Sequence, residues 1–170
     1  MEKITIRPLA QTDLNNLLVF ANALSVENTF VQLSGEKITE QQEREFLAKR
    51  LSASENGNGM SLVCMIGTSF AGLGGIDRLP KRSAHVGRLN ISIAKEFRGK
   101  GAGFALLTAL LEHARSALQL RMVILHCFEN NTAAIRLYEK VGFKKAGVVP
   151  EMLLRNGEYL GEITMYVPLV

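Results

Sequence analysis

Several residue types that mark special classes of protein are scarce or absent in this chain. Its 170 residues include no tryptophan, two cysteines, four prolines and only 6% aromatic residues. Cys64 and Cys127 are too few and too far apart for a disulfide framework or a zinc site, so we expect two buried thiols. The longest nearly apolar run, Ala102 to Leu111, is about half the length that a membrane-spanning helix needs. These absences argue against disulfide-rich and membrane-spanning proteins.

What is present predicts an ordinary globular domain. Apolar residues make up 47% of the chain and charged residues 21%, which is typical of soluble proteins. The length suffices for one domain with a core but not for two. Glu2, Lys3 and Arg7 carry charge where a signal peptide would have its apolar run. We therefore expect a single domain over residues 1–170 that is soluble and cytoplasmic and has no membrane partner.

Charge is distributed unevenly along the chain. Between Asp77 and Lys100, seven basic residues stand against two acidic ones, a net +5 where the whole chain carries +4. Between residues 11 and 60 the balance reverses, with seven acidic residues against four basic ones. A basic segment attracts phosphate-bearing partners. Because no aromatic residue lies between Phe70 and Phe97 to stack on bases, a small phosphorylated ligand is favoured over nucleic acid.

Apolar periodicity and turn signals predict the element order β-α-α-β-β-β-α-β-α-β-β. Thr12 and Thr39 have the character of helix N-caps, and Asn156-Gly157 is typical of a hairpin turn. The strand that starts at Val86 and a later strand, apolar on both faces, flank an amphipathic helix, so these two strands must be parallel. The expected fold is mixed α/β, with a mostly antiparallel central sheet and helices on both faces. Its strands are 4–9, 61–66, 70–76, 86–94, 122–128, 143–149 and 159–167, and its helices lie within 12–21, 39–51, 106–118 and 132–141.

The sharpest local feature is a glycine-rich turn between a strand and a helix, Arg98-Gly99-Lys100-Gly101-Ala102-Gly103. Its three glycines let backbone N–H groups converge, and the helix that follows directs the positive end of its dipole to the same place. The Walker A pattern fails because Lys100 is followed by Gly101, and the dinucleotide-binding pattern fails because Phe104 or Leu106 stands where its third glycine belongs. The turn predicts a pyrophosphate site of another kind, and a turn without a ligand is the alternative.

Two segments resemble the GNAT superfamily of N-acetyltransferases. Arg98-x-x-Gly101-x-Gly103 is similar to the superfamily's Arg/Gln-x-x-Gly-x-Gly/Ala motif, whose amides bind the coenzyme A pyrophosphate. Further on, Asn-x-x-Ala-x-x-Leu-Tyr-x-x-x-Gly-Phe over residues 131–143 resembles its second coenzyme-binding segment at every position. The similarity covers residues 61–147, whereas the first 60 residues agree only in their β-α-α pattern. It implies one GNAT domain that uses acetyl-CoA as co-substrate and needs no metal.

The resemblance also implies roles for single residues. Tyr138 becomes the general acid, because a phenol with a pKa of about 10 stays protonated at pH 7 and can protonate a departing thiolate. Without the resemblance, Tyr138 would be read as a packing residue and Asn131 as a plain helix cap. The backbone of Ile91 and Ile93 would pair with the pantetheine arm, while their side chains belong to the core or the sheet surface. The implied coenzyme-binding residues are Ile91, Ile93, Arg98, Gly99, Lys100, Gly101, Ala102, Gly103 and Asn131.

The general base is not evident from the sequence. No acidic residue lies between Asp77 and Glu96, where many members of the superfamily have one. Asp77, His85 and a water relay remain candidates, although both residues fit a surface position better. We expect His126 to be a satisfied core histidine and His113 to be a surface residue.

An N-acetyltransferase accounts for both motifs, the basic segment and the tyrosine. We expect direct attack of an amine, from a small molecule or from a protein or peptide N-terminus, on acetyl-CoA. A non-catalytic acyl-CoA sensor is the alternative, although it would not need Tyr138, and a nucleic-acid-binding domain would explain only the charge. The acidic excess between residues 11 and 60 hints at a cationic acceptor. A homodimer is left open.

Overall fold

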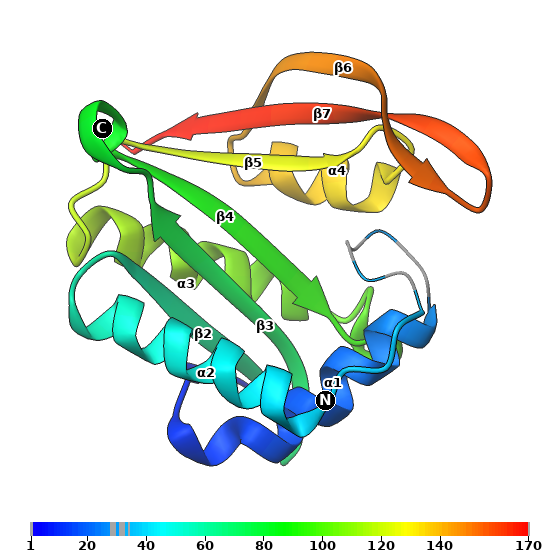
Figure 1. Cartoon of the computed structure of the whole chain (residues 1–170). Helices are drawn as coiled ribbons and strands as arrows, with labels where there is room; N and C mark the ends of the chain where they lie inside the picture. The colour runs from blue at the N-terminus through cyan, green and yellow to red at the C-terminus, as the bar shows by residue number, and fades with distance from the viewer. Residues whose placement is uncertain (1, 28–29, 31–32, 34, 170) are drawn as a thin grey trace.

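The computed structural model of the chain describes residues 2–27, 30, 33 and 35–169. Its centre is a seven-stranded sheet with the strand order β1-β2-β3-β4-β5-β7-β6 (Figure 1). Only β4 and β5 pair in parallel, and the other neighbours are antiparallel, which confirms the expected sheet and element order. The strands are β1 Ile4–Pro8, β2 Gly59–Ile66, β3 Ser69–Arg78, β4 Val86–Ile93, β5 Met122–Phe128, β6 Lys144–Arg155 and β7 Glu158–Pro168. The helices are α1 Leu14–Glu27, α2 Glu40–Glu55, α3 Ala102–Ser116 and α4 Thr132–Lys140, with short 3₁₀ turns η1 Gln11–Asp13, η2 Lys81–Ser83 and η3 Lys95–Phe97.

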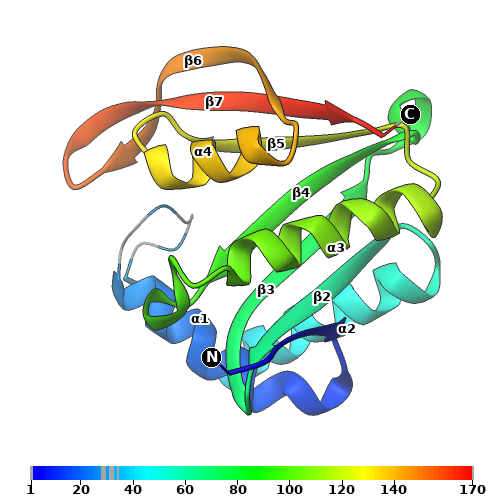
Figure 2. The same ribbon diagram turned by 180° about the vertical axis from the view of Figure 1, so that it is seen from behind.

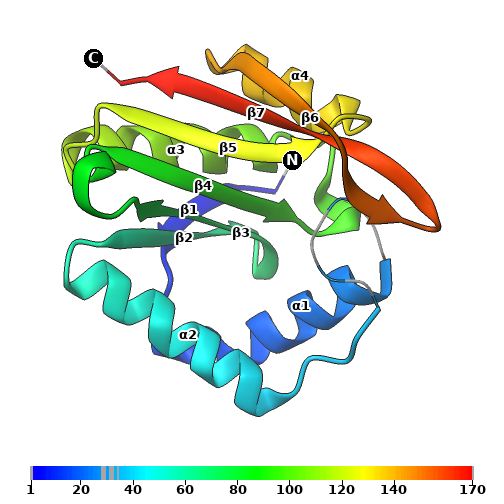
Figure 3. The same ribbon diagram turned by 45° about the horizontal axis from the view of Figure 1, so that its top comes forward.

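Helices cover both faces of the sheet. α3 lies across one face, as the reverse view in Figure 2 shows, and buries Leu106, Leu107 and Leu110 completely against the strands. α1 and α2 lie on the opposite face (Figure 3), where Leu17 and Leu47 join a second apolar cluster. Fully burying one leucine contributes about 1.5–3 kcal/mol, so these stripes of leucine fix the layers. Within the described residues, no helix combines the length and the apolar character that crossing a bilayer requires.

Two sequence expectations about local structure differ in outcome. The capping box at α2 is confirmed, because the Gln42 amide N–H donates to Thr39 Oγ1 and the Gln42 side chain accepts from the Thr39 N–H. The N-cap expected at Thr12 is wrong, since the chain passes through η1 and Ala10 holds the cap position. The buried Asp13 carboxylate instead accepts from the Arg7 guanidinium and from the Ala10 N–H. Hydrogen bonds from Arg7 hold the pKa of Asp13 below its ordinary value.

The final strands are longer than expected. β6 continues to Arg155, whereas the sequence predicted an end near Val149. A register shift between Val149 and Leu153, with a positive φ at Glu151, lets the strand continue past Pro150, which cannot donate a ladder hydrogen bond. The hairpin turn expected at Asn156-Gly157 is confirmed, and both residues have positive φ.

Candidate active site

β4 and β5 separate along their length. The register joins residues 86–88 with 122–124 and then stops, although β4 continues to Ile93 and β5 to Phe128. Figure 1 shows the two strands meeting at one end and diverging toward the other. We call the diverging stretches, residues 89–93 and 125–128, the β4–β5 split. Among the described residues, this edge of β4 has no strand partner, so its peptide groups can bind an extended ligand as a neighbouring strand would.

The two isoleucines expected to bind the coenzyme lie in this split. Ile91 and Ile93 both belong to the diverging part of β4. Their side chains are half-buried and pack against the core cluster under α3. The expected core role of these side chains is therefore observed, and it does not involve their backbone groups on the open edge of β4.

The glycine-rich turn directly follows β4 and η3. Gly99 and Gly101 have φ of +72° and +86°, in the left-handed region that residues with a Cβ avoid. Gly101 is the N-cap of α3 and offers no side-chain cap, and the first turn of α3 contains no acidic residue. The first N–H groups of a helix have no intrahelical partner. They are therefore available to an anion, as expected from the sequence.

Close packing explains why the last position of the turn, Gly103, is a glycine. A Cβ built on Gly103 would lie 3.1 Å from Leu137 Cδ2 and 3.7 Å from Ile93 Cγ1. The start of α3 therefore approaches both α4 and the end of β4 closely because this residue has no side chain. Ala102, beside it, is fully buried in the core. The last residues of the turn are thus held against α4 and against the end of β4, one of the two strands of the split.

The two cations of the turn are placed differently. The Arg98 guanidinium pairs with both carboxylate oxygens of Glu27, at the end of α1, and its Nε donates to the Ile93 carbonyl at 2.9 Å. Lys100 is exposed, and its Nζ lies 5.8 Å from the centroid of the Phe97 ring. An anion at the turn would thus meet Lys100 directly, whereas Arg98 already has a carboxylate partner.

The basic segment identified in the sequence is divided in the fold. β4 is eight residues long and separates the basic residues around η2 from those around the turn, a span of roughly 25 Å at about 3.3 Å per residue. Arg78 is occupied by the carbonyls of Ala84 and Leu118. Only Lys95, Arg98 and Lys100 lie at the end of β4 that carries the turn.

Tyr138 projects from α4 into the core beside the end of β5. It is 7% exposed, and its ring lies 5.8 Å from that of Phe143. Burial raises the pKa of its hydroxyl well above the ordinary value of 10.0, and the charge of a Cys127 thiolate would raise it further. Cys127 belongs to the split, so Tyr138 lies next to the split. Its phenol stays protonated at neutral pH.

Asn131 is the N-cap of α4, and its side-chain oxygen accepts from the Ala134 N–H at 3.3 Å. The plain capping role is therefore observed. A contact between Asn131 and the coenzyme stays a prediction.

The base candidates named from the sequence lie away from the split. Asp77 is opposite Arg88, at the paired end of β4, and forms an ion pair with Arg50. His85 is an exposed residue just before β4, at the same end. The expectation that His113 is a surface residue is confirmed. None of the three side chains is positioned to act on a group held in the split.

The expectation that His126 is a core histidine is wrong. Burial along β5 alternates up to Cys127, with Val123, Leu125 and Cys127 buried and His126 exposed, and only Phe128 at the end of the strand is buried on the face of His126. The strand looks apolar on both faces in the sequence because its other open-face residues are apolar as well. His126 Nδ1 lies 3.2 Å from Thr164 Oγ1 and 3.5 Å from Glu162 Oε1, both on β7. The prediction of two buried free thiols is confirmed.

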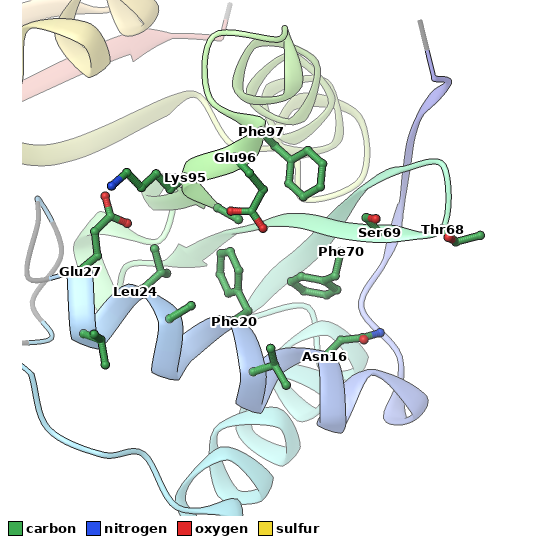
Figure 4. Close-up of a pocket in the computed structure, with 14 residues that line it drawn as sticks. Asn16, Phe20, Leu24, Glu27, Thr68, Ser69, Phe70, Lys95, Glu96 and Phe97 are labelled. Carbon is green, nitrogen blue, oxygen red and sulfur yellow. The ribbon is translucent and has the colours of Figure 1, made fainter.

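A pocket of about 600 Å³ lies on the α1 side of η3 (Figure 4). Phe20 and Phe70 meet edge to face in it, with ring centroids 5.3 Å apart. Neither Tyr138 nor the glycines of the turn line this pocket, although Glu27, the partner of Arg98, does. It is therefore a separate hollow beside the turn and not a continuation of the split.

The acidic excess between residues 11 and 60 does not form one acidic surface. Asp13 pairs with Arg7, Glu27 with Arg98, and Glu40 with Arg44. Glu43 is buried, and desolvation raises the pKa of its carboxyl. The hint of a cationic acceptor from this charge count therefore gains no support from these side chains.

Comparison with known proteins agrees with this geometry. The family model of the acetyltransferase (GNAT) domain matches residues 3–144. The chain belongs to the GNAT acetyltransferase family. A GNAT-family acetyltransferase from Streptococcus pneumoniae has the same fold, with a TM-score of 0.87 and 29% identity over 98% of this chain and 99% of that one. The structure of YncA from Salmonella typhimurium with its cofactor acetyl-CoA has a TM-score of 0.86 at 18% identity, covering 98% of this chain and 94% of that one.

Curated relatives match a shorter part of the chain. The L-amino acid N-acetyltransferase AaaT of Escherichia coli is 32% identical over 85 residues, which are 50% of this chain and 52% of that protein. The spermidine N(1)-acetyltransferase of Vibrio cholerae is 35% identical over 77 residues, 45% of this chain and 44% of that protein. The matched segments thus span about half the length of these relatives. Among the described residues, no group of three or more metal-ligating side chains could hold a metal ion.

Sequence reasoning missed three polar residues near this site. Glu27 could not be identified from the sequence, because it lies 71 positions away from Arg98, its ion-pair partner. Glu162 and Thr164 could have been found, since they alternate with Ile163 and Met165 along β7, a period-two pattern with one polar face. That pattern would have predicted an open face on the neighbouring strand as well.

Proposed function

We propose that this protein transfers the acetyl group of acetyl-CoA to the nitrogen of an amine by direct attack. The observation that carries the proposal is the β4–β5 split, which begins where the strands stop pairing, ends at the glycine-rich turn and has Tyr138 beside it. A candidate phosphate site, an unpaired strand edge and a candidate proton donor all border the split. The pyrophosphate, the pantetheine arm and the thioester of the donor would need one of each.

The donor would be bound mostly by backbone groups. Amides from Gly99 to the first turn of α3, together with Lys100, would bind the pyrophosphate, because a positive φ and the absence of a cap leave the N–H groups accessible. The edge of β4 around Ile91 and Ile93 would pair with the pantetheine amides and polarise the thioester carbonyl. Asn131 would contribute from the start of α4.

The chemistry then requires the amine nitrogen to lose two protons and the thiolate to gain one. An alkyl ammonium has a pKa of about 10.4, so roughly one acceptor molecule in a thousand is neutral at pH 7 and a base helps to free its lone pair. The neutral nitrogen attacks the thioester carbon, becomes positive and loses its second proton, the C–S bond breaks, and the thiolate takes a proton from Tyr138. Burial keeps this phenol protonated before the transfer.

The acceptor class is an alkyl amine. The two curated relatives described above are named for an L-amino acid and for spermidine, and both compounds present a primary amine. A peptide or protein N-terminus has the same nucleophile and belongs to the same proposal. We further propose that residues 1–170 act as one domain in the cytoplasm, and the mass of the protein in solution will decide whether a homodimer forms.

A turnover assay tests the function. Acetyl-CoA is supplied with a panel of amino acids, polyamines and short peptides, and released thiol and N-acetylated product are both measured. At least one amine should give equal amounts of the two products. Tight binding of acetyl-CoA with no product from any amine would instead favour an acyl-CoA sensor.

A further inference from the structure

We propose that His126 is the general base that takes the proton of the acceptor amine and that Glu162 and Thr164 orient its ring. The proposal rests on the proposed function and supplies the group that the sequence could not. It starts from side chains on β5 and β7 that the donor site does not use.

The three side chains lie together on one open face. The register of β5 and β7 places His126 opposite Thr164 and Phe128 opposite Glu162, so all four share a face of the sheet. Nδ1 of His126 lies 3.2 Å from Thr164 Oγ1 and 3.5 Å from Glu162 Oε1. The histidine side chain is 34% exposed and that of Glu162 is 17% exposed. The ring is therefore held on one side and accessible on the other.

The neighbours of Nδ1 determine which ring nitrogen can act as a base. A carboxylate can only accept hydrogen bonds, so an unprotonated Nδ1 beside Glu162 would place its lone pair against a lone pair of the carboxylate. The arrangement favours the tautomer with the proton on Nδ1, which Thr164 and Glu162 can accept. Nε2 then carries the free lone pair. An acceptor amine would give its proton to this nitrogen.

The position of His126 suits an amine that approaches the split from the face opposite Tyr138. Side chains alternate along β5, so Leu125 and Cys127 pack in the cluster that contains Tyr138, and His126 lies on the other face. On that second face, Phe30 from the segment after α1 contacts Phe128, with ring centroids 5.7 Å apart. A proton acceptor and a proton donor thus border the split from opposite faces.

The protons balance in this arrangement. The acceptor arrives as an ammonium and loses one proton to solvent to become the nucleophile. As the C–N bond forms, the nitrogen becomes positive and gives its second proton to His126 Nε2. The C–S bond breaks, and the thiolate takes the Tyr138 proton. Transfer of a proton from the imidazolium to the phenolate through water restores both residues, and the net release is one proton.

Removal and chemical rescue of the base test the proposal. His126→Ala should lower kcat by about 10²-fold or more for an alkyl amine, the usual range of general base catalysis. Free imidazole should restore at least about a tenth of the lost rate, because the vacated position is open to solvent. His113→Ala is the matched control, since it removes an exposed histidine on α3 and should change neither the rate nor the response to imidazole. Melting temperature and acetyl-CoA affinity are measured for both variants.

A second pair of variants tests the orienting role of the carboxylate. Glu162→Gln can donate its amide N–H to Nδ1 and so favours the wrong tautomer, which should lower kcat about tenfold or more with little change in the KM for acetyl-CoA. Glu162→Asp retains a carboxylate and should keep more of the rate. Equal losses in the two variants would contradict an orienting role.

The outcomes separate this proposal from the function on which it rests. Wild-type protein that acetylates no amine would overturn both. Active wild-type protein with a loss below about threefold in His126→Ala would overturn the role of His126 alone. A large loss that imidazole does not restore would make His126 a structural residue and would also overturn the proposal.

Discussion

Arg98 and Glu27 form a bidentate ion pair between the coenzyme-motif turn and the last residue of α1. The Arg98 side chain is 39% exposed and that of Glu27 is 18% exposed. An ion pair this accessible contributes about 0–1 kcal/mol to stability, so an incoming phosphate can compete with the carboxylate for the guanidinium.

Removing the carboxylate should leave acetyl-CoA affinity unchanged or raise it. Glu27→Gln releases Arg98 from its competing partner, whereas Arg98→Gln removes the cation and should weaken binding about threefold to tenfold. Calorimetric titration with acetyl-CoA measures both. Should the two variants weaken binding equally, Arg98 would act by holding α1 in place and not by contacting phosphate.

Gly101→Val should abolish most acetyl-CoA binding. A Cβ at φ +86° costs about 1–2 kcal/mol in backbone strain and also obstructs the amides of the turn. Gly57→Val is the matched control, because Gly57 has φ +72° with open space around it in a loop remote from the turn. The two variants should lose similar stability in urea titrations, and only Gly101→Val should lose affinity. Equal affinities would remove the turn from the donor site.

Tyr138→Phe should lower kcat by up to about 10²–10⁴-fold and spare acetyl-CoA affinity, because the ring still packs against Phe143. Since burial raises the pKa of the hydroxyl above 10.0, the phenol should stay protonated through pH 9 and cause no alkaline decline there. A loss under about threefold, with acetyl transfer shown to limit the rate, would leave Tyr138 as a packing residue. A loss of affinity alone would make it a coenzyme contact.

Cys127 should make the fold less stable in alkali. Burial, and then the charge of Glu162, raises the pKa of its thiol from 9.0 to about 11. Below pH 9 both the folded and the unfolded chain hold this proton, and between pH 9 and 11 only the folded chain does. Stability therefore falls as pH rises, by about 1.4 kcal/mol at pH 10 from this group. Cys127→Ala should show a smaller difference in unfolding free energy between pH 8 and pH 10, and an unchanged difference would contradict the cause.

The sequence predicted those parts of the fold and site that depend on local patterns. Element order, the parallel pair, the glycine turn and the capping box at Thr39 all rest on residues close together in the chain. The N-cap prediction at Thr12 failed because the Asp13 carboxylate pairs with Arg7, and this ion pair outweighs the local capping preference of Thr12. The prediction that His126 is a core histidine failed because its neighbours on β5 are apolar, so the sequence does not show which face of the strand is open. The divergence of β4 and β5 cannot be predicted from the sequence of either strand, because it depends on where the pairing between them stops.

Hydrogen–deuterium exchange with and without acetyl-CoA tests most directly where the donor binds. Amides on the open edge of β4 at residues 89–93 and in the turn at residues 99–104 should exchange more slowly when acetyl-CoA is bound, because they gain hydrogen-bond partners. The β2–β3 hairpin should be unchanged. Protection confined to residues 16–27 and 68–70, which line the separate pocket, would place the donor elsewhere and contradict the account.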